Sequence, residues 1–505
     1  MILIEITAAI DAAGTLQTFY VGSDSFVTSP ADTPASVAFD PRLIDPGTLG
    51  VNIFSDGRTG GTTKLETGEI VLANADGALD AWLNYSFDGR PVTIRAGNGG
   101  AYPGAFATIL VGTIESAEAS WDKFVLRLKD KQQLFALPAL TTRYAGNNAL
   151  PAGLEGTASD LGGKVKPRTH GKVFNVSAPL VNTSKLTYEV GACFAINAVY
   201  DRGLAITAGA DFATTALLQA AAPAAGTYIT CLVDGYFRLG STPAGQITAD
   251  VTQGAAAASR TVAQIIKQLA INAGLSAGEI SAADVTALDA AAPQVVGIWL
   301  SDESSFAQAM DLVAASVGAW YGFDAAGVLR LGQITTPAGA PVVTLYDYDT
   351  LAGFERRPPR DNGIPVWRVV LGHTRIWTTQ PSDLAGAVTT ATRAYLAEPA
   401  RKAASEDAAI KTQWLLAGTA EDDTLLTVAA EAATEAARRL ALYKTRRDIF
   451  DVPVSVDLLT LHSLKLGDVV ALQVARFGLD VGKNFRIIGI RLALAAGTAT
   501  LALWG

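Results

Sequence analysis

Short turns rich in glycine, aspartate and asparagine recur through the first third of the chain and limit what it can fold into. They stand at Gly22-Ser23-Asp24, Asp56-Gly57, Asn74-Ala75-Asp76-Gly77 and Asp88-Gly89. Such residues accept the positive φ angles that tight β-hairpins require. Between the turns apolar and polar residues alternate, as in Met1–Thr7, where one strand face would carry only isoleucines. This third of the chain therefore predicts a β-barrel or β-sandwich.

The last third contains the clearest helical pattern of the chain. In the segment 424–445 apolar residues recur at helical spacing, and Asp422 and Asp423 stand beside the positive N-terminal end. Glu435 and Arg439 are four residues apart and can form an ion pair on one helix face. From Ile449 to Trp504 the pattern returns to strands separated by glycine-containing turns, which predicts a second β-rich module.

The middle of the chain predicts a mixture of short strands and helices. Val173–Gly240 reads as short strands, and Thr261–Ala273 repeats its apolar residues at helical spacing. Ser304 or Ser305 can cap a second helix, which Ala319–Gln333 follows as a hairpin. The predicted fold is therefore multidomain and mainly β, with an α+β middle. The predicted domains cover residues 1–170, 171–253, 254–335 and 336–505.

The chain is poor in charge. Charged residues make up 17% of it, the net charge is −9 and the mean hydropathy is +0.26. Soluble proteins average about 25% charged residues, so we expect partners to cover part of this surface. The acidic balance argues against a clamp on phosphate backbones, which needs clustered lysine and arginine. No apolar stretch predicts a transmembrane helix, and no membrane insertion is expected.

Residues with reactive side chains are few and scattered. His170, His373 and His462 stand far in sequence from each other and from any cysteine, so no helical metal pair is present. Asp347 and Asp349 are neighbouring carboxylates, but a glycosidase needs two carboxyl groups across a cleft. We therefore predict no catalytic, cofactor-binding or metal-binding residue, no cofactor and no enzymatic activity.

Two motif matches stand in the wrong context. Gly274–Gly278 has the spacing of a nucleophile elbow but follows a predicted helix, so we expect a helix end there. Gly57–Lys64 lacks the Gly-Lys-Ser/Thr ending of a phosphate loop and is expected to be an exposed hairpin loop. The two cysteines, Cys193 and Cys231, are too few for a disulfide framework. Reduced thiols are expected, with a single bond between them as the alternative.

The order of several patterns along the chain is more informative than any motif alone. Gly68–Asp80 precedes Asp88-Gly89-Arg90, Ser304–Leu331 reads as helix then hairpin, and Leu464–Val470 precedes Phe485–Ile490. In this order they resemble the tail-tip (baseplate) hub proteins of long-tailed bacteriophages and gene transfer agents. The turn residues of this pattern are Gly68, Asn74, Asp76, Gly77, Asp80, Gly467 and Asp468.

The resemblance implies a structural protein of the virion with two tail-tube-like β-barrels, at 1–170 and 336–505, flanking smaller central domains. Three chains would form a ring that adapts a hexameric tail tube to central tip or fibre proteins and gates DNA passage. The implied partners are two further copies of the chain, the distal tail protein, and tail-tube or tape-measure proteins. DNA would pass through the lumen without sequence-specific binding. Some such hubs hold an iron–sulfur cluster on cysteines, and two cysteines cannot supply four thiolates.

Two other functions stay open at this point. A carbohydrate-binding adhesin or receptor-binding protein would use exposed aromatic residues, although core or interface packing is their more common use. A peptidoglycan hydrolase would use His373 or the pair Asp347 and Asp349. The aromatic candidates for a sugar site are Trp299, Trp320, Tyr321, Trp367 and Trp377.

Overall fold

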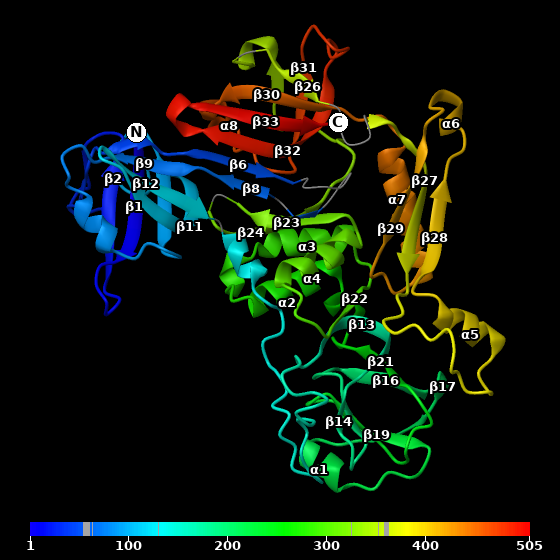
Figure 1. The fold of residues 1–505 in the computed structure, drawn as a ribbon. Coiled ribbons are helices and arrows are strands. Elements are labelled where there is room, and N and C mark those ends of the chain that lie inside the picture. Colours follow the sequence, from blue (N-terminus) through cyan, green and yellow to red (C-terminus); the bar gives the residue numbers. More distant parts are fainter. Residues whose placement is uncertain (54–60, 63, 130, 325, 352, 358–362) are drawn as a thin grey trace.

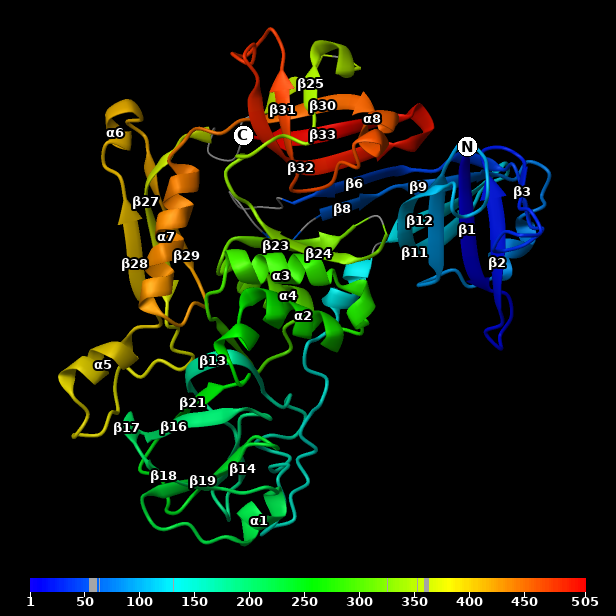
Figure 2. The same ribbon diagram turned by 180° about the vertical axis from the view of Figure 1, so that it is seen from behind.

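The fold is mainly β, with several sheets around a helical layer, so the predicted fold class is confirmed (Figure 1). The computed structural model describes residues 1–53, 61–62, 64–129, 131–324, 326–351, 353–357 and 363–505. Two half-barrel sheets come from the two ends of the chain, and the middle extends away from both (Figure 2). No helix in these ranges is long and apolar enough to cross a membrane. The division into four domains stays a prediction.

The N-terminal half-barrel is a seven-stranded sheet. Its order is β2 (Leu16–Gly22), β1 (Ile2–Ala9), β10 (Pro91–Ala96), β11 (Ala107–Ala119), β12 (Lys123–Lys129), β9 (Glu69–Ala73) and β5 (Leu43–Asp45). The alternation in β1 places Ile4 and Ile6 in the same core as Trp82 and Phe124. The edge strands β2 and β5 do not pair with each other in the described residues, so the sheet is open. A short hairpin of β3 (Phe26–Val27) and β4 (Ala38–Phe39) lies beside it.

The C-terminal half-barrel uses six strands from the last third of the chain. Their order is β25 (Thr344–Tyr346), β31 (Val469–Gln473), β32 (Lys483–Ala493), β33 (Thr498–Trp504), β30 (Ile449–Ser455) and β26 (Glu355–Arg357). Its core contains Val452, Phe485 and Leu501. The strands predicted between Ile449 and Trp504 are confirmed, with the short helix α8 (Val456–Leu461) between β30 and β31.

A hairpin from the first third of the chain extends this second sheet. We call β6 (Thr48–Asn52) and β8 (Lys64–Thr67) the arm. β6 pairs antiparallel with β32, from Thr48 opposite Ala493 to Asn52 opposite Gly489. The short strand β7 (Gly61–Thr62) pairs in parallel with β23 of the central hairpin. The arm is continuous in the chain with β5 and β9 of the N-terminal half-barrel, and its strand β6 is hydrogen-bonded to β32 of the C-terminal half-barrel, as the blue strands beside the red sheet in Figure 1 show.

Gly68 stands where the arm returns to the N-terminal half-barrel, and it leaves no room for a side chain. A Cβ there would lie 2.5 Å from the backbone nitrogen of Thr48 and 2.8 Å from its carbonyl oxygen. Because these are backbone atoms, we expect Gly68→Ala to distort the base of the arm and to lower the free energy of unfolding by about 1–3 kcal/mol.

Chemical denaturation of both variants measures this effect. Gly278→Ala is the matched control, because no described atom lies within 4 Å of its added Cβ. Equal denaturation midpoints for Gly68→Ala and Gly278→Ala would contradict the prediction.

The middle of the chain contains two five-stranded sheets. Their orders are β17-β16-β21-β13-β22 and β14-β15-β20-β19-β18. The strands are β13 (Arg168–Val176), β14 (Leu180–Asn182), β15 (Thr187–Glu189), β16 (Ala195–Asp201), β17 (Leu204–Ala205), β18 (Thr207–Asp211), β19 (Thr227–Cys231), β20 (Tyr236–Leu239), β21 (Ile247–Thr252) and β22 (Gly297–Leu300). Helix α1 (Thr215–Ala220) packs against β19.

A helical layer and a hairpin follow. They consist of α2 (Val262–Asn272), α3 (Ala282–Ala291), α4 (Phe306–Ala315), β23 (Ala319–Phe323) and β24 (Leu329–Gln333). The predicted helices and hairpin are confirmed. The hydroxyl of Ser305 accepts a hydrogen bond from the backbone N–H of Gln308 and so caps α4.

A separate three-stranded sheet precedes the long helix. β27 (Val366–His373) is central, with β28 (Arg401–Glu406) and β29 (Gly418–Asp423) on its two sides, and α7 (Ala429–Tyr443) packs on it. The loops carry the short helices α5 (Thr390–Ala397) and α6 (Ile410–Gln413).

The predicted extent of the long helix over 424–445 is wrong at both ends. Asp422 and Asp423 lie in β29 and do not cap α7. The N–H groups of Thr424 and Thr427 donate to the carbonyls of Gly372 and Val295 at 3.0 and 3.1 Å. These tertiary hydrogen bonds hold the segment before α7 extended, against its helical sequence pattern.

Candidate functional site at the junction of the half-barrels

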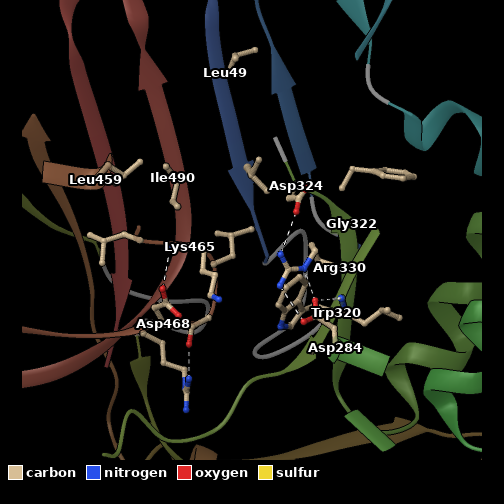
Figure 3. A pocket seen from close by; sticks show the side chains of 18 of the residues that line it. Leu49, Asp284, Trp320, Gly322, Asp324, Arg330, Leu459, Lys465, Asp468 and Ile490 are labelled. Carbon is tan, nitrogen blue, oxygen red and sulfur yellow. Dashed lines mark hydrogen bonds and ion pairs between the residues drawn. The ribbon is translucent and has the colours of Figure 1, made fainter. Parts of the chain in front are cut away.

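A cavity of about 430 Å³ lies where the arm, the N-terminal half-barrel, the central hairpin and the C-terminal half-barrel meet. Figure 3 shows Leu49 of the arm, Leu459 and Ile490 of the C-terminal part, and Trp320 of β23 around it. Most of the lining side chains are apolar, as is typical of a packing interface between parts of a fold.

One wall of this cavity carries a closed group of charges. The guanidinium of Arg330 donates to both oxygens of Asp284, at 2.5 and 3.0 Å, and to Asp324 at 3.2 Å. The hydrogen bonds to Asp284 raise the pKa of Arg330 above its ordinary value. The group therefore fixes β24 to α3 and to the hairpin turn, with the one guanidinium shared by both carboxylates.

The opposite wall contains two residues of the turn pattern. Gly467 has a φ of +87°, and its N–H donates to the carbonyl of Ile487 at 2.8 Å. Asp468 accepts a hydrogen bond from the N–H of Lys465 at 3.0 Å. Arg486 donates to the carbonyl of Gly467 at 2.5 Å and so ties the turn to β32. The turn thus holds one side of the junction in place.

The remaining pattern residues lie elsewhere. Gly68 is at the base of the arm. Asn74, which is 2% exposed, accepts from the N–H of Leu79 at 2.7 Å and donates to Asp80 at 2.9 Å. Gly77 has a φ of +71° within the same turn. These side chains close a turn after β9 and form no part of a pocket at the junction.

Asp76 connects this turn to another loop. Its two oxygens accept from Arg42 at 2.8 and 2.7 Å, and these bonds lower the pKa of Asp76 to about 2. The sequence pattern thus marks residues with structural contacts, although the junction cavity itself contains only Gly467 and Asp468 among them.

The histidine and carboxylate candidates do not come together. His170 is buried on β13, and His373 at the end of β27 has its Nδ1 2.9 Å from the hydroxyl of Thr374. Asp347 and Asp349 lie in a short turn after β25, a strand of a different sheet from β27, and Asp349 accepts a hydrogen bond from the N–H of Tyr346 at 2.9 Å. Within the described residues no group of three or more His, Cys, Asp or Glu could hold a metal ion.

The structure explains the first of the two motif matches, Gly274–Gly278, which lies within the described residues. Ser276 stands after α2, and its hydroxyl donates to Glu279 at 2.8 Å, so the predicted helix end is confirmed. Residues 57–60 and 63 of the Gly57–Lys64 loop lie outside the described residues. Cys193 and Cys231 are buried free thiols, and burial raises the pKa of Cys193 to about 12 and also raises that of Cys231.

The aromatic candidates for a sugar site divide into two groups. Trp299, Trp320 and Tyr321 are buried, which confirms core packing for these three. Trp367 and Trp377 are half-buried beneath cations, with Lys411 3.8 Å from the Trp367 ring centre and Arg375 4.5 Å from that of Trp377. These rings do not form one exposed platform.

Several large apolar side chains are instead exposed on loops. Those at least four-fifths exposed include Trp121, Tyr348, Leu415, Leu416 and Val481. Trp121 lies at the turn between β11 and β12, and Leu415 and Leu416 follow α6. Such loop positions are candidates for burial against partner proteins.

Comparison with known proteins finds similar structures in phage tails. A tail protein from Neisseria meningitidis MC58 is 11% identical, with a TM-score of 0.43, over 99% of this chain and 96% of that one. The 43 kDa tail protein of prophage MuSo2 from Shewanella oneidensis is 10% identical, with a TM-score of 0.41, over 100% and 98%. A chain of a gene transfer agent virion is 15% identical, with a TM-score of 0.44, over 68% and 84%. No protein-family model and no curated protein matches the sequence.

Proposed function

We propose that this chain is a structural protein of a phage-type tail and that it forms the hub at the tail tip. The observation that carries the proposal is the pair of half-barrels, one from each end of the chain, joined through the arm. In a ring of three such chains, six half-barrel modules would face a hexameric tail tube. The order of turn and strand patterns along the sequence supports the same assignment.

The surface supports an assembly role. Several of the most exposed apolar side chains, among them Trp121, Leu415 and Leu416, lie on turns and loops, where a neighbouring subunit can cover them. The net charge of −9 suits a conduit, because a wall without clustered positive charge does not retain passing DNA. The proposed partners are two further copies of the chain, the distal tail protein, tail-tube or tape-measure proteins, and a central fibre or tip protein.

We also propose that the chain is not an enzyme. The carboxylates of the charged group at the junction are both bonded to Arg330, and the candidate residues of a hydrolase lie apart, with His373 at the end of β27 and Asp347 and Asp349 in the short turn after β25. An adhesin that uses the five aromatic candidates is not favoured either, because three of their rings are buried.

The oligomeric state of the purified full chain tests the proposal. We expect light scattering to give three times the 52.4 kDa chain mass, and electron microscopy to show a ring with threefold symmetry and a central opening. Trp121→Ser and Leu415→Ser/Leu416→Ser variants show whether those loop positions contribute to the ring. A folded protein that stays monomeric across all accessible concentrations would contradict the proposal.

A further inference from the structure

The two terminal parts of the chain carry opposite net charge. Residues 1–129 contain 15 aspartates and glutamates and eight lysines and arginines, which gives a net charge of −7. Residues 444–505 contain five acidic and eight basic side chains, which gives a net charge of +3. An asymmetry of this kind directs association between molecules where the charges of each sign lie together on the surface.

Four cations lie around one aspartate at one end of the C-terminal half-barrel. Arg356 and Arg446 lie 2.5 and 3.7 Å from the carboxylate of Asp448, which directly precedes β30. Burial lowers the pKa of Lys483, against the attraction of Asp448. Repulsion from Arg447 and Arg356 lowers that pKa further, so these cations lie close together. We call this group of five residues the basic end.

The positive charge of the basic end is not balanced within the chain. Neither Arg447 nor Lys483 forms an ion pair with another described residue. The guanidinium of Arg447 lies 5.1 Å from the ring centre of Trp504, and its Nε is buried without a hydrogen-bond partner. The carboxylate of Gly505, whose N–H donates to the carbonyl of Asp448 at 3.0 Å, adds one negative charge. Four positive charges thus face two negative ones, and an acidic partner would balance them.

The N-terminal half-barrel has an end of the opposite kind. Asp40 and Asp76 share the guanidinium of Arg42, at 2.6 and 2.7 Å. Asp80 lies in the same turn as Asp76, and the backbone carbonyl of Asp122 accepts a hydrogen bond at 2.8 Å from the first residue of that turn. All four carboxylates are exposed. We call these four aspartates, together with Arg42, the acidic end.

Large apolar side chains stand beside both charged ends. Trp121, which is 95% exposed, precedes Asp122 at the acidic end, and Lys123 after it is the one further cation of that turn. Val481, which is 84% exposed, stands two residues before Lys483 at the basic end. Exposed apolar side chains next to unbalanced charge are typical of an interface between proteins. They favour a protein partner for the basic end over a phosphate backbone.

The two charged ends lie at opposite ends of the joined half-barrels. The arm leaves the N-terminal half-barrel where β5 ends and β9 begins, whereas the acidic end lies where β5 begins and β9 ends. The arm pairs with β32 at residues 489–493, whereas Lys483 is the first residue of that strand. In Figures 1 and 2 the C-terminus lies beside α7, on the side of its half-barrel away from the N-terminal half-barrel. One chain therefore keeps its two charged ends apart.

We propose that the basic end docks on the acidic end of a second copy of this chain, with Trp121 of that copy inside the contact. The inference rests on the ring proposed above and identifies the two surfaces that meet in it. The contact is head-to-tail, since each copy contributes a different surface to each of its two neighbours. Such contacts form a closed ring when the rotation between neighbours brings the last copy back to the first.

Charge reversal at one end at a time tests the contact in the full chain. We expect Arg446→Glu/Lys483→Glu and Asp76→Lys/Asp122→Lys each to weaken self-association at least tenfold in analytical ultracentrifugation, because like charges then face each other. Lys483→Glu and Asp122→Lys alone, both at exposed positions, serve if a double variant does not fold. Lys164→Glu, an exposed lysine in the loop before β13, is the matched control and should associate as the wild type does.

An equimolar mixture of the two double variants tests the head-to-tail arrangement. Each variant keeps one unchanged end, so we expect the two to bind each other at least tenfold more tightly than either binds itself. Wild-type association should weaken between 0.1 and 1 M salt, over which the Debye length falls from about 10 to about 3 Å.

Rings that form equally well in the wild type and in both double variants would overturn this inference alone and leave the tail-hub proposal in place. A mixture that associates no better than its components, or wild-type association that is independent of salt, would overturn it as well. A wild type that stays monomeric would contradict the tail-hub proposal and, with it, this contact.

Discussion

Replacement of Glu435 by alanine is expected to lower the free energy of unfolding by about 3–5 kcal/mol, because it removes the buried carboxylate that Arg438 and Arg439 share and leaves the buried Arg439 only the half-exposed Asp422, 3.0 Å away, as a counter-ion. The Glu435 carboxylate is fully buried. It accepts from Nε and Nη2 of Arg438 at 2.7 and 2.8 Å, and from Nε of Arg439 at 2.7 Å. Arg439 is itself only 4% exposed.

This ion cluster also connects two parts of the molecule. Arg439 donates to the carbonyl of Ala315 at 2.6 Å, at the end of α4. Arg438 donates to the carbonyls of Val317 and Ile334, at 3.0 and 3.2 Å, on either side of the central hairpin. The cluster therefore fixes α7 to the helical layer, and its loss should also speed amide hydrogen exchange in α7.

Guanidinium denaturation and hydrogen exchange measure these effects. Glu421→Ala is the matched control, because Glu421 on β29 forms an exposed ion pair with Lys402 on β28, across the central strand β27. Exposed ion pairs contribute little to stability. If Glu435→Ala and Glu421→Ala unfold at the same denaturant concentration, the buried cluster does not have the role assigned to it.

The sequence predicts the local part of this cluster. The spacing of Glu435 and Arg439 indicates an i,i+4 pair, and the structure confirms it. It does not predict that Glu435 is buried, because burial depends on α4 and the hairpin, which are more than 100 residues away in the chain. Local spacing fixes which side chains on one helix can meet, whereas their energy depends on the packing of distant segments.

The same limit explains what sequence reasoning missed at the junction. Alternation and turn residues predict the strands of both terminal sheets. The register of Thr48 opposite Ala493 arises only when the arm crosses from one half-barrel to the other. Leu49 therefore lines a cavity with Ile490, and no local pattern could have indicated it. Among the residues of the sequence pattern, Gly68 is the one that marks the base of the arm, because its turn leaves no room for a side chain.

The second large effect should appear as pH falls from 6.5 to 4. The pKa of His170 is about 4 in the folded protein, against about 6.5 in an unfolded chain. The unfolded state therefore binds a proton that the folded state excludes, so the stabilisation that is present above pH 6.5 is lost toward pH 4. The expected loss is about 1.4 kcal/mol per pH unit, or about 3 kcal/mol in total.

Comparison of wild type with His170→Gln isolates this effect. Burial raises the pKa of Glu189 and of Asp250, so these groups favour the folded state on acidification, but they do so in both proteins. We expect the difference in unfolding free energy between the two proteins to change by about 3 kcal/mol between pH 7 and pH 4. His462→Gln should keep the acid-dependent loss, because His170 is still present. Parallel pH profiles for wild type and His170→Gln would show that the imidazole is protonated in the folded protein as readily as in the unfolded chain. That result would contradict the assignment of a buried, neutral imidazole on β13.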